Sequence, residues 1–177
     1  DAVLIKRVLD IGAQAVLIPY VQNVEEAKRA VAAVRYPPSG IRGVATSGRA
    51  SRYGRVTGYL QNAEKEICTL VQVETRESLD QLEAIAQVDG VDGVFIGPSD
   101  LSASFGHVGN PQHPEMQKIM ESAVTRLKAV GKPAGILTGN EEEARRYIAW
   151  GYTFVAVGSD VGLLARGADT LAKKFKT

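Results

Sequence analysis

Short runs of apolar residues alternate along the chain with segments in which apolar residues recur every third or fourth position. The runs, such as CTLVQVE and TFVAVGS, have the length and β-branched composition of buried strands, whereas the segments between them have the period of amphipathic helices. The predicted strands cover 15–21, 68–74, 93–99, 133–139 and 153–159. The predicted helices cover 4–11, 23–35, 78–88, 114–131, 141–151 and 163–175, with a further short helix from Asp100.

Local signals mark several ends of these helices. Asn23 stands at a helix N-cap position, and Pro114 and Gly131 stand at the start and the end of one helix, as is typical of these residue types. The stretch 36–60 carries two prolines, several glycines and four arginines, so we predict a long loop there.

Repeated strand–helix units without a sign of antiparallel pairing predict a parallel α/β sheet, either an open doubly wound sheet or part of a (β/α)₈ barrel. No GxGxxG motif follows the first strand, which weighs against a dinucleotide-binding fold. The chain also begins in a helix with no strand before it. We therefore predict that residues 1–177 form one domain, the last five βα units of a TIM barrel, with the first three units upstream.

Two of the predicted strands lead into carboxylates that we expect to meet at one edge of the sheet. Glu74 ends the run LVQVE, and Asp100 follows GVFIGPS. The carboxyl ends of parallel strands open on the same side, and two carboxylates there suit a hard divalent cation. Gln72 shares a strand face with Glu74 and is placed to donate to a substrate oxygen. The alternative is that Glu74 simply ends a strand in solvent.

Other polar residues have structural interpretations beside functional ones. Asp100 stands where an aspartate caps a helix, although free backbone N–H groups at Ser99 and Asp100 could also bind a carboxylate or phosphate. Asp10 lies in the last turn of its helix, where its charge meets the negative end of the helix dipole, and by itself this indicates a surface carboxylate. His107 and His113 lie in the loop FGHVGNPQHPE, where loop or cap roles are favoured over catalysis.

Composition excludes several classes of partner. The formal net charge is +1 and the basic residues form no long cluster, so we predict no nucleic-acid partner. The longest apolar runs are too short to span a bilayer and no signal peptide is visible, so we predict no membrane partner. The single cysteine, Cys68, excludes an internal disulfide and fits a reducing cytoplasm.

Several motifs taken together resemble the HpcH/HpaI aldolase family: LVQVETRE, FIGPSDLS, RYPPSGIRGVATSGRASRYGR, GNPQHPE and FVAVGSD. The resemblance runs to Phe175. It implies a class II pyruvate aldolase on a (β/α)₈ barrel that uses Mg²⁺, Mn²⁺ or Co²⁺ to cleave a 4-hydroxy-2-oxo acid reversibly to pyruvate and an aldehyde. It also implies a cytoplasmic homo-oligomer, a hexamer with an exchanged C-terminal helix. The implied substrate is of the 4-hydroxy-2-oxoheptanedioate type, with 2-dehydro-3-deoxyglucarate as the alternative.

The resemblance assigns roles to residues at the carboxyl ends of the predicted strands, which we call the rim. Glu74 and Asp100 match the two metal-binding carboxylates, and Asp100 also borders the substrate. Gln72 matches a substrate-contacting glutamine, and Ser99 matches a position whose backbone contacts the substrate beside the metal aspartate. Leu137, in GILTG, matches a residue that lines the substrate pocket.

The same resemblance gives Asp10 a catalytic role, because VLDIG matches the aspartate that raises the basicity of a catalytic histidine. That histidine and an enolate-stabilising arginine are expected upstream of Asp1, since neither His107 nor His113 lies in a matching motif. Two rival interpretations are an acyl-CoA carbon–carbon lyase of the citrate lyase type, for which no nucleotide-binding surface is evident, and an inactive subunit that only builds the oligomer. A histidine and an arginine in the upstream segment would favour the aldolase.

Overall fold

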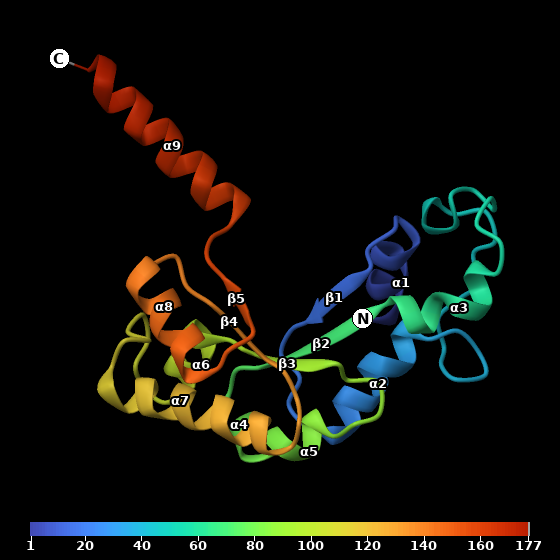
Figure 1. Cartoon of the computed structure of the whole chain (residues 1–177), viewed down its shortest axis with the longest axis horizontal. Coiled ribbons are helices and arrows are strands. Elements are labelled where there is room, and N and C mark those ends of the chain that lie inside the picture. Colours follow the sequence, from blue (N-terminus) through green and yellow to red (C-terminus); the bar gives the residue numbers. More distant parts are fainter. Residues whose placement is uncertain (177) are drawn as a thin grey trace.

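The computed structural model describes residues 1–176, and Thr177, the last residue of the predicted domain, lies outside the described residues. The chain forms a five-stranded parallel sheet in the order β1-β2-β3-β4-β5. The sheet curls like part of a barrel wall, with α2, α4, α5 and α7 on one side of it (Figure 1). The strands are β1 (Ala15–Ile18), β2 (Cys68–Val73), β3 (Gly93–Ile96), β4 (Ala134–Leu137) and β5 (Phe154–Ala156). The predicted barrel-type α/β fold with five parallel strands is confirmed.

Most predicted helices are present, with two differences. The helices are α1 (Ala2–Asp10), α2 (Val24–Val34), η1 (Arg49–Ser51), α3 (Tyr59–Glu66), α4 (Arg76–Asp80), α5 (Leu82–Ala86), α6 (Pro98–Ser104), α7 (Pro114–Ala129), α8 (Glu141–Trp150) and α9 (Asp160–Phe175). The prediction of a continuous loop over 36–60 was wrong at its end, where α3 begins. Only Ala63 of α3 is buried, so the helix has no apolar stripe to reveal it. The helix predicted over 78–88 is divided at Gln81, whose backbone leaves the helical region.

The outer face of the sheet carries the core. Along β2 the side chains alternate, with Val71 and Val73 fully buried against the helices and Leu70 and Gln72 on the opposite, half-buried face. The two edge strands are not buried on both faces. Leu17 of β1 is 39% exposed and Phe154 of β5 is 48% exposed, because neither strand has a second neighbour among the described residues.

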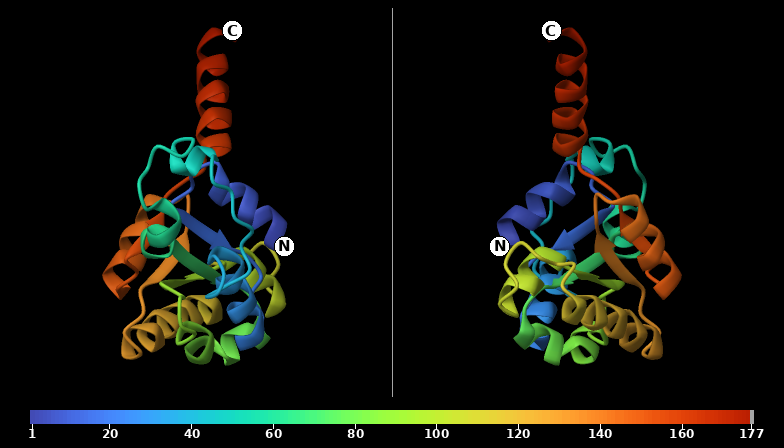
Figure 2. Two further views of the ribbon diagram at one scale, coloured as in Figure 1. Left: turned by 90° about the vertical axis from the view of Figure 1, so that its right-hand side faces the viewer. Right: turned by 90° about the vertical axis from the view of Figure 1, so that its left-hand side faces the viewer.

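Helix α9 stands apart from the rest of the described chain. It extends away from the sheet, as both side views show (Figures 1 and 2). None of its residues is buried, although it carries apolar side chains that are each more than half exposed, namely Val161, Leu163, Leu164, Leu171 and Phe175. Within residues 1–176 nothing covers these apolar side chains of α9. Within residues 1–176, no helix combines the length and apolar character needed to cross a membrane.

Candidate active site

Glu74 follows the last residue of β2 and is held in one orientation. Its side chain is buried, with 3% of the residue exposed. The backbone N–H of Tyr20 donates to Oε1 at 2.7 Å, and Nε2 of Gln72 donates to Oε2 at 2.6 Å. Tyr20 adopts a left-handed backbone conformation with φ of 58°, which is unusual for a tyrosine. Both carboxylate oxygens are therefore fixed by neighbours from β2 and from the turn after β1.

Asp100 lies near Glu74, just beyond the end of the neighbouring strand β3. It lies in the first turn of α6, which begins at Pro98 directly after β3. Burial raises the pKa of Glu74 above its ordinary value, and the hydrogen bonds from Gln72 and Tyr20 only partly offset this. The charge and hydrogen bonding of Asp100 raise the pKa of Glu74 further. The structure thus brings Glu74 and Asp100 together at the carboxyl ends of β2 and β3.

A glycine makes this approach possible. Val73 pairs with Ile96, and the N–H of Gly97 donates to the carbonyl of Val73 at 3.1 Å, so Gly97 lies beside Glu74. A Cβ at Gly97 would lie 2.5 Å from Oε2 of Glu74 and 2.8 Å from Nε2 of Gln72. The backbone of β3 therefore passes close under the two side chains only because residue 97 has none.

We expect Gly97→Ala to weaken divalent-cation binding at the rim by at least about tenfold, a change of about 1.4 kcal/mol. The added methyl group displaces the Glu74 carboxylate from its two hydrogen bonds. Gly139→Ala is the matched control, because a Cβ at that position meets no atom within 4 Å. Calorimetric titration of the full-length protein with Mn²⁺ measures the difference, and equal affinities for the two variants would contradict this role of Gly97.

The other predicted rim residues lie around the carboxylates. The side-chain amide of Gln72 donates a hydrogen bond to Glu74, and within the described chain this contact orients the Glu74 carboxylate. Ser99 is exposed in the first turn of α6, next to Asp100. Leu137 ends β4 and is 45% exposed. It shares the sheet face of Gln72, because Gln72 pairs with Phe95 and Phe95 pairs with Gly135, two residues before Leu137.

Asp10 is not the isolated surface carboxylate that its place at a helix end indicates. Oδ1 accepts a hydrogen bond of 2.8 Å from Nη2 of Arg42, and Oδ2 pairs with Lys6. The Arg42 side chain is completely buried, and the Asp10 side chain is 19% exposed. Burial alone would raise the pKa of Asp10, but the hydrogen bonds and charges of Arg42 and Lys6 outweigh it and lower the pKa.

Arg42, which pairs with Asp10 on the amino side of β1, is a residue that the sequence pattern missed. Its guanidinium lies 4.5 Å from the centre of the Tyr36 ring. Its Nε and Nη1 atoms have no hydrogen-bond partner among residues 1–176. The only signal in the sequence was an arginine within a glycine-rich stretch, which equally fits a solvated loop. Within the described chain the side chain of Asp10 hydrogen-bonds to Lys6 and Arg42, and to neither His107 nor His113.

The donor set at the rim fits a hard divalent cation. Within residues 1–176, no lysine or arginine forms an ion pair with Glu74 or Asp100. Burial raises the pKa of Glu74 most, and the neighbouring charge of Asp100 raises it further, so a bound cation would stabilise the charged form of Glu74. Oxygen ligands of this kind are those that Mg²⁺ and similar cations prefer, with remaining positions left to water or substrate. The residues that would hold such a cation are therefore Glu74 and Asp100.

Comparison with known proteins shows the family to which this chain belongs. The family described as HpcH/HpaI aldolase/citrate lyase matches residues 1–167. The chain belongs to this family of carbon–carbon lyases.

Individual relatives agree with this assignment. The chain is 63% identical to a pyruvate aldolase of Rhizobium etli, covering all of this chain and 70% of that protein. It is 57% identical to a 4-hydroxy-2-oxo-heptane-1,7-dioate aldolase of Salmonella heidelberg, covering 99% of this chain and 67% of that protein. Among solved structures, a family member from Burkholderia cenocepacia superposes with a TM-score of 0.91 at 36% identity, covering all of this chain and 70% of the other. The prediction of an aldolase-type lyase is confirmed.

Proposed function

We propose that this protein is a metal-dependent class II pyruvate aldolase. It reversibly cleaves a 4-hydroxy-2-oxo acid of the heptanedioate type to pyruvate and an aldehyde. The observation that carries the proposal is the pair of carboxylates, Glu74 and Asp100, at adjacent strand ends. The chain that bears them is 57% identical to an aldolase named for the heptanedioate substrate.

The residues of the chain contribute binding and orientation. Glu74 and Asp100 hold a divalent cation, Mg²⁺, Mn²⁺ or Co²⁺, and Gln72 keeps the Glu74 carboxylate aimed at it. The cation, when bound, supplies Lewis-acid stabilisation for negative charge that develops on the 2-oxo acid. Backbone N–H groups at Ser99 and Asp100, at the start of α6, are placed to bind the substrate carboxylate. Leu137 borders the apolar part of the substrate.

Proton transfer requires a base beyond these residues. Aldol cleavage begins with removal of the proton from the 4-hydroxyl group, and the C3–C4 bond then breaks to give the aldehyde and the enolate of pyruvate. A proton returned to C3 of the enolate gives pyruvate. We assign neither His107 nor His113 to this task and propose that a histidine and an arginine upstream of Asp1 supply it. In this proposal residues 1–177 are the last five units of an eight-unit barrel, and Asp10 supports the upstream histidine.

The rival functions differ in their substrates. A lyase acting on an acyl-CoA thioester and an inactive oligomer-building subunit both fit the fold, but the identities of 57% and 63% to proteins named as aldolases favour the aldolase. A coupled assay of pyruvate release by the full-length protein tests this choice. We expect kcat/KM to be higher with 4-hydroxy-2-oxoheptanedioate than with 2-dehydro-3-deoxyglucarate. Release of pyruvate from neither substrate would contradict the proposal.

We further propose a cytoplasmic homo-oligomer in which α9 packs against a neighbouring subunit. The apolar residues Leu163 and Leu164 of α9 are 65% and 75% exposed in the single chain. We expect the double variant Leu163→Glu, Leu164→Glu to lower the molar mass of the full-length protein in light scattering, because a charge on an apolar contact is strongly unfavourable. Lys174→Glu, near the end of the same helix, is the control for a change in charge alone. An unchanged oligomer in the double variant would contradict this role of α9.

A further inference from the structure

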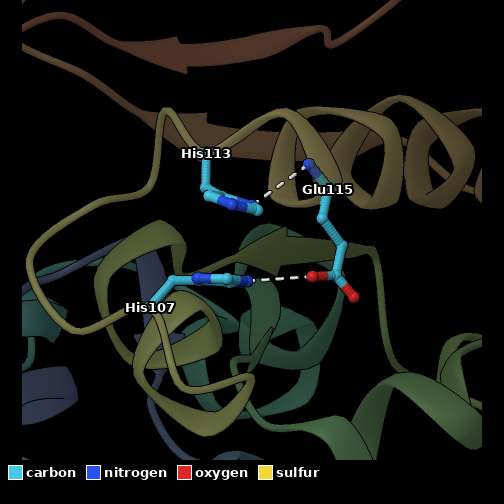
Figure 3. Close-up of side chains that lie close together, drawn as sticks. All are labelled: His107, His113 and Glu115. Atoms are coloured by element: carbon cyan, nitrogen blue, oxygen red, sulfur yellow. Dashed lines mark hydrogen bonds and ion pairs between the residues drawn. The ribbon is translucent and has the colours of Figure 1, made fainter.

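Two histidines from the loop between α6 and α7 meet a glutamate in the first turn of α7. The imidazole rings of His107 and His113 stack with their centres 3.7 Å apart and their planes within 16° of parallel (Figure 3). Nε2 of His107 lies 2.9 Å from Oε2 of Glu115, and the backbone N–H of Glu115 donates to Nδ1 of His113 at 3.3 Å. Each residue offers a ligand atom, and these atoms all lie within 4.8 Å of one another. None of these three residues belongs to the candidate active site at the strand ends.

The chemistry of this set differs from that of the rim carboxylates. Imidazole nitrogen is the ligand that Zn²⁺, Ni²⁺ and Cu²⁺ prefer, and two imidazoles with one carboxylate leave a fourth position for water. Glu74 and Asp100 offer oxygen alone, which suits harder ions. We propose that His107, His113 and Glu115 bind one divalent transition-metal ion of the zinc class.

Binding requires the side chains to rearrange while the backbone of the loop keeps its place. Ligand atoms around a tetrahedral zinc ion lie about 3.4 Å apart, given metal–ligand distances near 2.0–2.1 Å. His107 and Glu115 already approach that separation. The Nδ1 atom of His113 accepts a long hydrogen bond, so it carries no proton. It can therefore bind a metal through the same lone pair, without a change of tautomer, once this hydrogen bond is broken. His107 binds through Nε2 once its ring proton resides on Nδ1. The two rings must tilt out of their stacked arrangement, because the lone pair of each nitrogen lies in its ring plane and nearly parallel planes do not meet at one ion.

The loop that carries the histidines is held in shape by its own backbone. The N–H of His107 donates to the carbonyl of Ser102 at 2.8 Å, and the N–H of His113 donates to the carbonyl of Asn110 at 3.1 Å. The side chain of Gln117 in α7 also donates to the carbonyl of Pro111 at 2.8 Å. Because these contacts place the histidines before a metal arrives, less ordering remains to oppose binding. Both rings are partly exposed, and the Glu115 side chain is 54% exposed, so an ion can reach them.

Titration of the full-length protein with Zn²⁺ by calorimetry tests the site, with Mg²⁺ in large excess to compete at the strand-end carboxylates. His113→Asn removes a ligand but keeps a good helix cap on α7. His107→Gln removes the second nitrogen ligand, and Glu115→Gln weakens the third. Glu121→Gln is the matched control, an exposed carboxylate on the same helix that lies outside the cluster.

We expect the protein and the Glu121→Gln variant to bind one more equivalent of Zn²⁺ than the His107→Gln and His113→Asn variants, in which this binding weakens at least about tenfold. Zn²⁺ should also raise the melting temperature of the parent more than that of either histidine variant, since it binds only the folded state. The proposal is overturned if the stoichiometry and the thermal shift are the same in the parent and both histidine variants.

Discussion

Glu74→Gln is expected to abolish metal-dependent cleavage while making the metal-free protein more stable. Loss of a carboxylate ligand removes the Lewis acid, which contributes several kcal/mol to such reactions, so kcat should fall by at least about a thousandfold. The effect on stability has the opposite sign. The pKa of Glu74 is raised in the folded state, so its charged form destabilises the fold at neutral pH, and a neutral glutamine removes that penalty.

The pH dependence follows from the direction of this shift. Because the folded protein holds the Glu74 proton more tightly than the unfolded chain, stability falls as pH rises from the ordinary glutamate pKa through the raised value. The Glu74→Gln variant should lack this fall. Melting curves in chelator between pH 4 and 8, paired with kinetics in saturating Mn²⁺, measure both effects. Glu77→Gln, an exposed neighbour in the first turn of α4, serves as the control. Retained metal-dependent turnover in Glu74→Gln would contradict the assignment.

Asp10→Asn is expected to lower stability by roughly 2–3 kcal/mol, because the buried Arg42 guanidinium loses its counter-charge. The helix dipole alone would favour a neutral or slightly stabilising change, but it leaves out the ion pair with the buried Arg42. Asp80→Asn is the matched control. Asp80 also ends a helix but is exposed, so its replacement should leave the melting temperature unchanged or slightly raised. A drop in stability no larger than that of Asp80→Asn would contradict the importance of the Asp10–Arg42 pair.

The stabilisation by Asp10 has a defined pH window. Its pKa is lowered in the folded state, so its contribution is complete above the ordinary aspartate pKa of about 3.9 and is lost as pH falls further. The difference in melting temperature between the parent and Asp10→Asn should therefore shrink below about pH 4. If Asp10 also supports an upstream histidine, the variant loses turnover with a changed pH–rate profile even well below its melting temperature.

The sequence pattern predicted those parts of the fold that depend on local chemistry. Five apolar runs became five strands, and Asn23 caps α2 through its side chain as expected. Helix α3 was not predicted, because it buries almost no apolar side chain and therefore shows no hydrophobic periodicity. The division between α4 and α5 at Gln81 was also invisible, since no proline or glycine marks it.

Contacts between distant segments explain what else could not be predicted. The position of Glu74 and Asp100 at one edge of the sheet could be predicted, because the strands are parallel and their carboxyl ends lie on the same side. The pairing of Asp10 with Arg42 joins a helix end to a loop thirty-two residues away, and no periodicity reports such a contact. Likewise, the close approach of Gly97 to Glu74 follows from the register of β2 and β3, which the sequence does not define.

Turnover of the metal-stripped full-length protein tests the central claim most directly. The protein is dialysed against chelator, and pyruvate release from 4-hydroxy-2-oxoheptanedioate is measured before and after Mg²⁺, Mn²⁺ or Co²⁺ is added to the parent and to an Asp100→Asn variant. We expect no measurable cleavage without metal, full recovery in the parent and none in the variant. Cleavage that persists in excess chelator, or that metal restores equally in Asp100→Asn, would contradict the assignment of Glu74 and Asp100 as the metal-binding carboxylates of an aldolase.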